Sequence, residues 1–197
     1  MINHLIENNQ KWASSVKADN PDFFSELAKG QSPEYLWIGC ADSRIPACKI
    51  LGLEPGELFV HRNIANIVNT NDLNALSVIQ FAVKNLQVKN IILCGHYGCG
   101  GVQASMGPKC NGMIDDWLES VRDLYSSHSE ELSEIKDPQE AANALSELNV
   151  KMQVENICKT EVVQEAWSTG QTLEVHGWVY DISTGTIKDL EVSRSKA

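Results

Sequence analysis

Two short motifs in this chain combine residue types that bind a transition metal. Cys40 begins the segment Cys-Ala-Asp-Ser-Arg, and His96 and Cys99 lie in the segment Gly-His-Tyr-Gly-Cys-Gly-Gly. Two thiolates and an imidazole are ligands typical of zinc. Three protein ligands leave one coordination position for water, which is the arrangement of a catalytic rather than a structural site. The motifs therefore predict a metal-dependent enzyme.

Asp42 and Arg44 follow Cys40 within four residues, and the sequence leaves two roles open for the aspartate. Its carboxylate could take the fourth metal position and exclude water, which would be an inactive state. Alternatively, it pairs with Arg44 and accepts a hydrogen bond from the attacking water. Each motif alone is a weak signal, since a cysteine at the end of a strand is usually a core residue. The two motifs together, both flanked by glycines, favour a metal site.

Short apolar segments that alternate with helical patterns must position these residues. Helices are predicted for most of the first 30 residues and for 72–86, 115–126 and 138–168, and strands for 35–40, 58–61, 90–94, 173–180 and 187–192. This order indicates an α/β fold with a mainly parallel sheet flanked by helices, an antiparallel C-terminal edge strand and an N-terminal helical arm. Sites in such sheets form beyond the carboxyl ends of the strands, where Cys40 and His96 are expected to meet.

Composition restricts the class of protein further. The chain has 197 residues, 43% of them hydrophobic, and we expect a single domain over 1–197 with a helical arm at 1–30 and an α/β core at 35–192. A net charge of −10 argues against nucleic acid as a partner. No segment approaches the ~18 consecutive apolar residues of a membrane span. Without a secretory signal we expect a cytoplasmic protein with reduced cysteines, and import into an organelle after removal of a transit peptide stays open.

Five motifs together resemble the β-class carbonic anhydrases, and the resemblance extends over nearly the whole chain. It is carried by Cys-x-Asp-Ser-Arg at 40–44, Gly-Leu-x-Pro-Gly-Glu at 52–57, Arg-Asn-Ile-Ala-Asn at 62–66, Gly-His-x-x-Cys-Gly-Gly at 95–101 and His-Gly-Trp-x-Tyr at 176–180. The resemblance implies a lyase that hydrates carbon dioxide reversibly to bicarbonate and a proton. It also implies self-association as a dimer or tetramer.

The same resemblance assigns roles to the first two motifs. It implies that Zn2+ is bound by Cys40, His96 and Cys99, with Asp42 as a fourth ligand in the inactive state only. Asp42 and Arg44 then form the catalytic dyad. Two other functions stay open: a hydrolase of carbonyl sulfide or carbon disulfide on the same scaffold, and a bicarbonate-binding protein without turnover. The intact Asp42–Arg44 pair favours an enzyme over a pure binding protein.

A substrate pocket at a dimer interface is also implied by the resemblance. The positions that match its lining are Gln31, Phe59, Ile64 and Phe81. Many relatives carry tyrosine where this chain has Phe81, so this pocket would lack a hydroxyl group. Taken one by one, Phe59, Ile64 and Phe81 are more typical of ordinary core packing than of a substrate pocket.

Trp37, Arg62 and Tyr180 resemble a triad that binds a second, non-catalytic bicarbonate in one subgroup of the family. There the filled site favours Asp42 on zinc and thus the inactive enzyme, as expected when an anion prefers one of two states. The alternative is that Trp37 is simply buried in a strand and that Arg62 makes a structural ion pair. Relatives often have glutamate at the position of Cys48, where it can pair with the arginine, so an altered switch is expected here.

Overall fold

The structure is a computed structural model that describes residues 2–110 and 112–196. The chain divides into two compact units, with the boundary between Ser32 and Pro33. The first unit holds two helices, α1 (Asn3–Asp19) and α2 (Phe23–Leu27). None of the residues of α1 is buried, and Trp12 packs edge-to-face on Phe24 with ring centroids 5.5 Å apart. This unit corresponds to the helical arm expected at 1–30.

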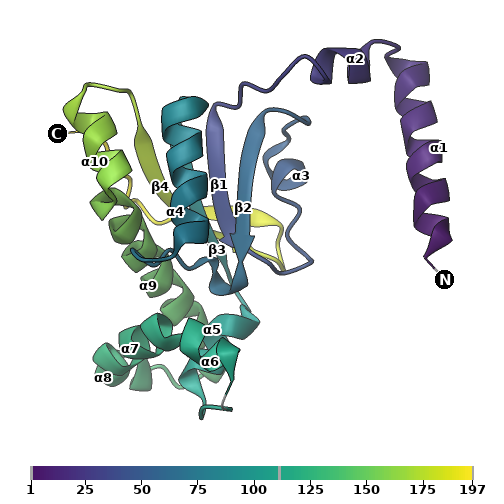
Figure 1. Cartoon of the computed structure of the whole chain (residues 1–197). Coiled ribbons are helices and arrows are strands. Elements are labelled where there is room, and N and C mark those ends of the chain that lie inside the picture. The colour runs from purple at the N-terminus through teal and green to yellow at the C-terminus, as the bar shows by residue number, and fades with distance from the viewer. Residues whose placement is uncertain (1, 111, 197) are drawn as a thin grey trace. The chain divides into compact units, whose positions relative to one another are not determined.

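The second unit is built around a five-stranded sheet with the order β2-β1-β3-β4-β5 (Figure 1). The first four strands in this order pair in parallel, and the last pair is antiparallel. The strands are β1 (Tyr35–Cys40), β2 (Leu58–Asn63), β3 (Asn90–His96), β4 (Glu174–Asp181) and β5 (Thr186–Asp189). The predicted fold class, a mainly parallel α/β sheet with an antiparallel C-terminal edge, is confirmed.

Helices occupy the connections between the strands. They are α3 (Ala47–Leu51), η1 (Ile64–Asn66), α4 (Leu73–Gln80), the π-helical turn η2 (Phe81–Asn85), α5 (Gly100–Met106), α6 (Met113–Trp117), α7 (Glu119–Ser127), α8 (Ser129–Ser133), α9 (Pro138–Lys159) and α10 (Glu161–Ser168). The helices predicted for 115–126 and 138–168 are each divided in two, at Leu118 and at Thr160, whereas the helix predicted for 72–86 continues without a break from α4 into η2. The break at Thr160 follows from its extended backbone, with φ −64° and ψ 141°.

Apolar side chains of β1 and β3 point to both faces of the sheet, so these two strands are buried on both sides. On one face, residues such as Leu36 and Leu93 pack against α4, α9 and α10. On the other face, Trp37 and Ile92 pack in a cluster that includes residues of α5 and α7. Burial on both faces explains why β1 and β3 are unbroken apolar runs in the sequence.

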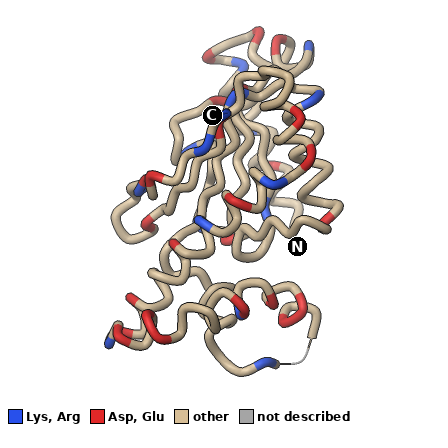
Figure 2. Tube along the Cα trace, turned by 90° about the vertical axis from the view of Figure 1, so that its left-hand side faces the viewer, with Lys and Arg blue, Asp and Glu red and all other residues tan. Residues whose placement is uncertain are grey.

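Charged side chains of both signs are spread over the described chain. Lys and Arg are interspersed with Asp and Glu along the trace (Figure 2). Among the described residues, no helix combines the length and the apolar composition that crossing a membrane requires. All six cysteines lie in the described part of the chain, and all are free thiols.

Candidate metal centre and catalytic site

The carboxyl ends of β1 and β3 bring the three predicted metal ligands together. Cys40 is the last residue of β1, His96 is the last residue of β3, and the two strands are direct neighbours in the sheet. Cys99 follows three residues after His96, at the start of α5. The sulfur atoms and one ring nitrogen of these three residues all lie within 4.8 Å of one another, and the three residues are buried.

The donor atoms have the separation and chemistry that zinc requires. The two sulfur atoms, Sγ of Cys40 and Sγ of Cys99, are 3.9 Å apart. A tetrahedral zinc with Zn–S bonds of about 2.3 Å sets two thiolates about 3.8 Å apart. The Nδ1 atom of His96 lies 3.0 Å from the carbonyl oxygen of Tyr97, a contact that fixes the ring when Nδ1 carries the proton. Nε2 of His96 is then a buried lone pair without a hydrogen-bond partner among the described residues, as a metal ligand would be before binding.

The two thiols are electrostatically coupled. The hydrogen bond from Cys99 lowers the pKa of Cys40 below the usual range of a thiol, although burial of Cys40 acts in the opposite direction. The pKa of Cys99 is raised, first by its hydrogen bond to Cys40 and then by burial. A divalent cation bound between the two sulfur atoms would favour the thiolate form of both cysteines.

Asp42 is held beside the ligands by Arg44. The Arg44 side chain donates from Nε to Oδ1 at 2.9 Å and from Nη2 to Oδ2 at 2.7 Å, and its backbone N–H donates to Oδ1 at 2.9 Å. These bonds hold the pKa of the Asp42 carboxyl well below its usual range. Oδ2 of Asp42 lies 3.8 Å from Nε2 of His96. Of the two roles left open by the sequence, this structure has Asp42 paired with Arg44, at the edge of the ligand set.

Trp37, Arg62 and Tyr180 come from three strands and share one face of the sheet. Arg62 is opposite Gly39 in the sheet register, and the indole of Trp37 covers Gly39, where an added Cβ would lie 2.3 Å from Nε1. Nε1 of Trp37 is buried without a hydrogen-bond partner among the described residues. Tyr180 of β4 is opposite His96 of β3 in the sheet register. Its hydroxyl group is near the β4–β5 turn, 3.9 Å from the position that a Cβ added to Gly185 would take.

Arg62 also connects this group of three to the catalytic segment. Its Nε donates to the carbonyl oxygen of Cys40 at 2.8 Å, and its Nη2 donates to the carbonyl oxygen of Asp42. Cys48 is a half-buried free cysteine, so position 48 has no carboxylate that could form an ion pair with the guanidinium of Arg62 in place of these bonds. Arg62 thus bonds two backbone carbonyl groups, and no ion pair of Arg62 is found within residues 2–110 and 112–196.

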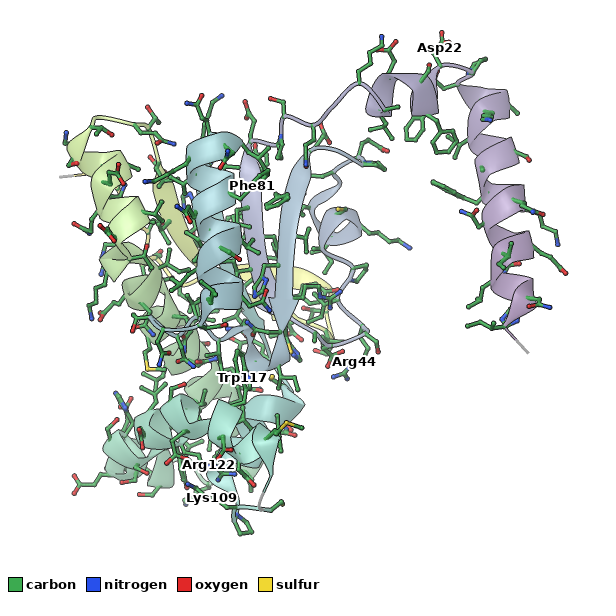
Figure 3. The ribbon with its side chains drawn as sticks, in the orientation of Figure 1. Asp22, Arg44, Phe81, Lys109, Trp117 and Arg122 are labelled. Carbon is green, nitrogen blue, oxygen red and sulfur yellow. The ribbon has the colours of Figure 1, made fainter. Side chains whose placement is uncertain are left out.

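The residues expected to line the substrate pocket are not gathered in one place within the second unit. Ile64 lies against Gly101, close to Cys99, since a Cβ on Gly101 would approach its Cγ2 to 2.8 Å. Phe59 stacks on Phe81 with ring centroids 5.8 Å apart. In the sheet register Phe59 is opposite Leu36, four residues before Cys40, so Phe59 lies about 13 Å along the strands from Cys40. Figure 3 likewise has Phe81 and Arg44 toward opposite ends of the sheet.

Exposure distinguishes the two interpretations of these pocket residues. Ile64 is 43% exposed and Phe81 is 44% exposed, so ordinary core packing is wrong for both. Phe59 is partly buried and packs against the core. Gln31, in the first unit, is exposed. Ile64 and Phe81 are thus exposed apolar side chains toward opposite ends of the strands.

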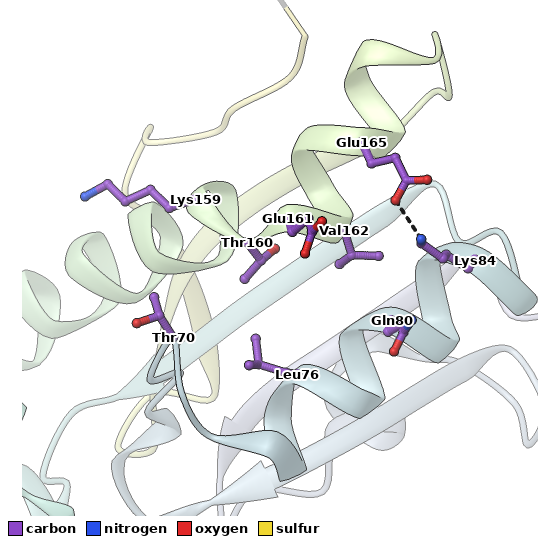
Figure 4. A pocket seen from close by; sticks show the side chains of 9 residues that line it. All are labelled: Thr70, Leu76, Gln80, Lys84, Lys159, Thr160, Glu161, Val162 and Glu165. Atoms are coloured by element: carbon purple, nitrogen blue, oxygen red, sulfur yellow. Dashed lines mark hydrogen bonds and ion pairs between the residues drawn. The ribbon is translucent and has the colours of Figure 1, made fainter.

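A separate groove lies far from the metal ligands. It has a volume of about 390 Å³. One side is formed by α4 and η2, and the other by the junction between α9 and α10 (Figure 4). Lys84 on the first side forms an ion pair of 2.6 Å with Glu165 on the second. The amino end of α9 is near the site, since Asn143 accepts a hydrogen bond from the N–H of Gly98. Thr160 is 17 residues further along, about 25 Å at the rise of an α-helix, so the groove does not belong to the site.

Sequence reasoning missed the turn η1, which lines the site between β2 and α5. Ala65 and Asn66 are buried, and both have positive φ, 60° and 48°. The turn packs on the start of α5, since a Cβ added to Gly101 would lie 3.2 Å from Cβ of Ala65. The Arg-Asn-Ile-Ala-Asn motif marks this turn in the sequence, but its conformation was not predictable because it contains no glycine.

The structure has a buried Cys-His-Cys set at the carboxyl edge of a parallel sheet, beside an ionised carboxylate. This arrangement is typical of the active site of a metalloenzyme. Comparison with known proteins agrees. A family model described as carbonic anhydrase matches residues 35–187. A carbonic anhydrase of Emericella nidulans is 50% identical over 188 residues, which are 95% of this chain and 82% of that protein.

Solved structures extend the similarity to the fold. A crystal structure of tetrameric β-carbonic anhydrases from Sordaria macrospora matches with a TM-score of 0.96 at 42% identity, over 98% of this chain and 98% of that one. The Coccomyxa β-carbonic anhydrase in complex with acetazolamide matches with a TM-score of 0.92 at 40% identity, over 96% of this chain and 86% of that one. The chain therefore belongs to the β-class carbonic anhydrases, a family of lyases.

Proposed function

We propose that this chain hydrates carbon dioxide reversibly to bicarbonate and a proton, with Zn2+ bound by Cys40, His96 and Cys99. One observation carries the proposal: Nε2 of His96 is buried without a hydrogen-bond partner in the described part of the chain, and the His96 ring lies beside two thiols at zinc-binding distance. Zinc bound there would lower the pKa of a bound water and stabilise developing negative charge. The same residues would bind no cation of the Ca2+ or Mg2+ type, which prefers oxygen ligands.

Asp42 and Arg44 orient the attacking water in this proposal. The carboxylate is ionised, since Arg44 lowers its pKa, and it can only accept hydrogen bonds. Accepting one from the water turns a lone pair of that water toward the carbon of CO2. The bidentate contact from Arg44 keeps Asp42 in this orientation, so that the carboxylate does not occupy the ligand set itself.

The proposal extends to inhibition by bicarbonate at Trp37, Arg62 and Tyr180. Arg62 supplies the positive charge, and the buried Nε1 of Trp37 is a donor without a partner in the described chain. Arg62 holds the carbonyl groups of Cys40 and Asp42, so an anion that draws the guanidinium away would loosen the segment that carries the dyad. This is a route by which occupancy favours Asp42 on zinc.

Inhibition is tested by measuring hydration against bicarbonate concentration at several pH values. The wild type should be inhibited more steeply at lower pH, and Arg62→Ala should lose this dependence. Arg194→Ala is the matched control, because Arg194 bridges to Val175 near the amino end of β4 and its guanidinium donates to the nearby carbonyl oxygens of Val192 and Ser193. Kinetics independent of bicarbonate in the wild type, or an unchanged profile in Arg62→Ala, would contradict the regulatory part of the proposal.

We further propose that the chain self-associates as a dimer or tetramer and acts in the cytoplasm. The exposed apolar residues Ile64 and Phe81, and an arm helix without a buried residue, leave apolar surface that a second copy would cover. The related Sordaria macrospora enzymes are tetrameric. Sedimentation of the purified protein should give a mass of two or four chains, and a monomer at micromolar concentration would contradict this part.

The catalytic proposal is tested on one sample for zinc content and for CO2 hydration. Cys40→Ser should lose zinc and activity together. Cys110→Ser, which changes an exposed cysteine outside the ligand set, is the matched control and should keep both. Retention of full activity by Cys40→Ser would exclude the ligand assignment.

A further inference from the structure

The loop between the candidate ligands His96 and Cys99 is bonded to a side chain of α9. The middle of this loop is formed by Tyr97 and Gly98, and Gly98 has a left-handed backbone with φ of 67°. Oδ1 of Asn143 accepts a hydrogen bond from the backbone N–H of Gly98 at 3.2 Å. The helix therefore holds the loop at a point between the two ligands.

The peptide group that Asn143 bonds is also the one that holds the imidazole ring of His96. The N–H of Gly98 and the carbonyl group of Tyr97 belong to one planar trans peptide, in which they point in opposite directions. The carbonyl oxygen of Tyr97 lies 3.0 Å from Nδ1 of His96. One rigid peptide group thus has the carboxamide of Asn143 on one side and the imidazole of His96 on the other.

The contact with this carbonyl group determines which nitrogen of His96 is left for a metal. A carbonyl oxygen only accepts hydrogen bonds, so in the neutral ring Nδ1 carries the proton and Nε2 has the lone pair. Nε2 is buried without a hydrogen-bond partner among the described residues. A peptide whose N–H is hydrogen-bonded is also more strongly polarised, so the bond to Asn143 makes the Tyr97 carbonyl a stronger acceptor.

Two further carboxamides orient Asn143 itself. Nε2 of Gln139 donates to Oδ1 of Asn143 at 3.1 Å, and Nε2 of Gln103, on α5, donates to Oε1 of Gln139 at 3.0 Å. Because Oδ1 of Asn143 accepts from both Gln139 and Gly98, the carboxamide cannot turn away from the loop without losing both bonds. The orientation of Asn143 is therefore supported by α5 as well as by α9.

Tyr97 is held a second time, through its side chain. Glu147 lies four residues after Asn143, on the same face of α9. Oε1 of Glu147 accepts from the hydroxyl group of Tyr97 and, at 2.8 Å, from Nζ of Lys188 on β5. The backbone N–H of Tyr97 donates to the carbonyl oxygen of Tyr180 at 3.1 Å. These bonds leave the peptide between Tyr97 and Gly98 little freedom to rotate.

We propose that Asn143 is a positioning residue for the metal centre. Through the peptide group between Tyr97 and Gly98, it holds the ring of His96 with Nε2 free for the metal. This inference rests on the proposed function in one respect, that His96 is a zinc ligand. In the described part of the chain Asn143 has no hydrogen bond to a metal ligand, so its effect on the metal passes through the peptide.

The surroundings of Asn143 decide which substitution tests this. Asn143 is half-buried and, together with Arg44 and Gly98, lines a hollow of about 460 Å³. A hollow of this size admits water, which could replace the carboxamide oxygen if the side chain were merely shortened. Asn143→Leu removes the acceptor while keeping a side chain of similar size over the N–H of Gly98.

The test has two readouts: zinc affinity, measured by competition with a chelator, and the exchange of the Nδ1 proton of His96 with solvent. The second uses proton NMR of the cobalt-loaded protein, because Co2+ shifts the ring protons of a bound histidine away from the other signals. Asn143→Leu should weaken zinc binding about tenfold or more, in the range found for groups that orient metal ligands. Its Nδ1 proton should exchange faster, because the carbonyl group that accepts it is no longer fixed. Asn143→Asp keeps an acceptor oxygen at the same place, so it should stay within about twofold of the wild-type zinc affinity.

Asn156→Leu is the matched control for a loss of stability without a change in the loop. Asn156 is also a half-buried asparagine of α9, and it donates to the carbonyl oxygen of Val68 and to Oε1 of Gln153. It is 13 residues beyond Asn143, about 20 Å along the helix. Asn156→Leu should lower the melting temperature while leaving the zinc affinity and the proton exchange as in the wild type.

The possible outcomes separate this inference from the proposed function. A zinc affinity within about twofold of wild type, with unchanged proton exchange, in Asn143→Leu would overturn the inference. An equal loss of affinity in Asn156→Leu would overturn it too. If Asn143→Leu does not fold, Asn143→Met, with a more adaptable side chain that also lacks the oxygen, decides the question by the same readouts. A wild-type protein that binds neither zinc nor cobalt would overturn the proposed function, and this inference with it.

Discussion

Removing the metal should lower the melting temperature of this protein by about 8–16 °C. The ligand atoms lie within 4.8 Å of one another in the folded chain, so binding needs no rearrangement of the site. Cys40 and Cys99 are 59 positions apart in the sequence, so the unfolded chain does not hold them together. A metal bound by the folded state and far less by the unfolded state stabilises the fold by mass action.

The magnitude follows from the occupancy of the site. At free zinc about 1,000 times the dissociation constant, binding adds about 4.1 kcal/mol to the free energy of unfolding. For a chain of this length, each kcal/mol moves the melting temperature by about 2–4 °C, which gives the range above.

Differential scanning calorimetry checks this on dialysed protein, with and without a zinc chelator and after zinc is added back. Cys40→Ser should melt near the apo wild type and should not respond to zinc. Cys110→Ser should behave as the wild type does. Equal melting temperatures for the loaded and chelated wild type, with zinc shown to be removed, would refute the reasoning that the site binds metal only in the folded chain.

Three further predictions concern residues around the ligands. Arg44→Lys should keep zinc but lower kcat/KM for CO2 roughly tenfold. Lysine retains the positive charge but cannot make the two parallel hydrogen bonds by which the Arg44 guanidinium holds Asp42. Loss of zinc on metal analysis would contradict this prediction. Because Arg44 lowers the pKa of Asp42, the pair stabilises the fold above the ordinary carboxyl pKa of about 4 and loses this contribution as the pH falls further. The difference in urea midpoint between wild type and Arg44→Lys should therefore shrink as the pH is lowered toward 3, and a growing difference would count against the pairing. Gly101→Ala should cost about 1–3 kcal/mol of stability on urea unfolding, because the new Cβ would lie 2.8 Å from Cγ2 of Ile64, whereas Gly100→Ala, with no atom within 4 Å of its new Cβ, should be close to neutral.

The candidate metal ligands could be placed from the sequence because parallel strands bring their carboxyl ends to one edge. Cys40 ends one apolar run and His96 follows the run at 91–94 after a single glycine, which predicts that both lie at the same edge of the sheet. The helix break at Thr160 was not predictable in the same way, since helical residues continue on both sides of it. Neither was the left-handed turn at Ala65, because a tertiary contact from α9, 84 positions away in the sequence, fixes it.

The substrate-pocket positions show a different kind of gap between sequence and structure. Phe59 and Phe81 stack on each other but lie about 13 Å along the strands from Cys40, so within one chain they are distant from the ligands. An apolar pattern in the sequence does not distinguish a core residue from an interface residue, since both are buried in the assembled protein. For Phe81, the exposed fraction of 44% in the single chain is what argues against a core position.

The most direct test of the account is stopped-flow CO2 hydration across pH on a sample whose zinc content is measured at the same time. The account predicts stoichiometric zinc and hydration that increases toward alkaline pH, with both lost in Cys40→Ser. A sample that carries stoichiometric zinc and catalyses no hydration at any pH, alkaline pH included, would contradict it.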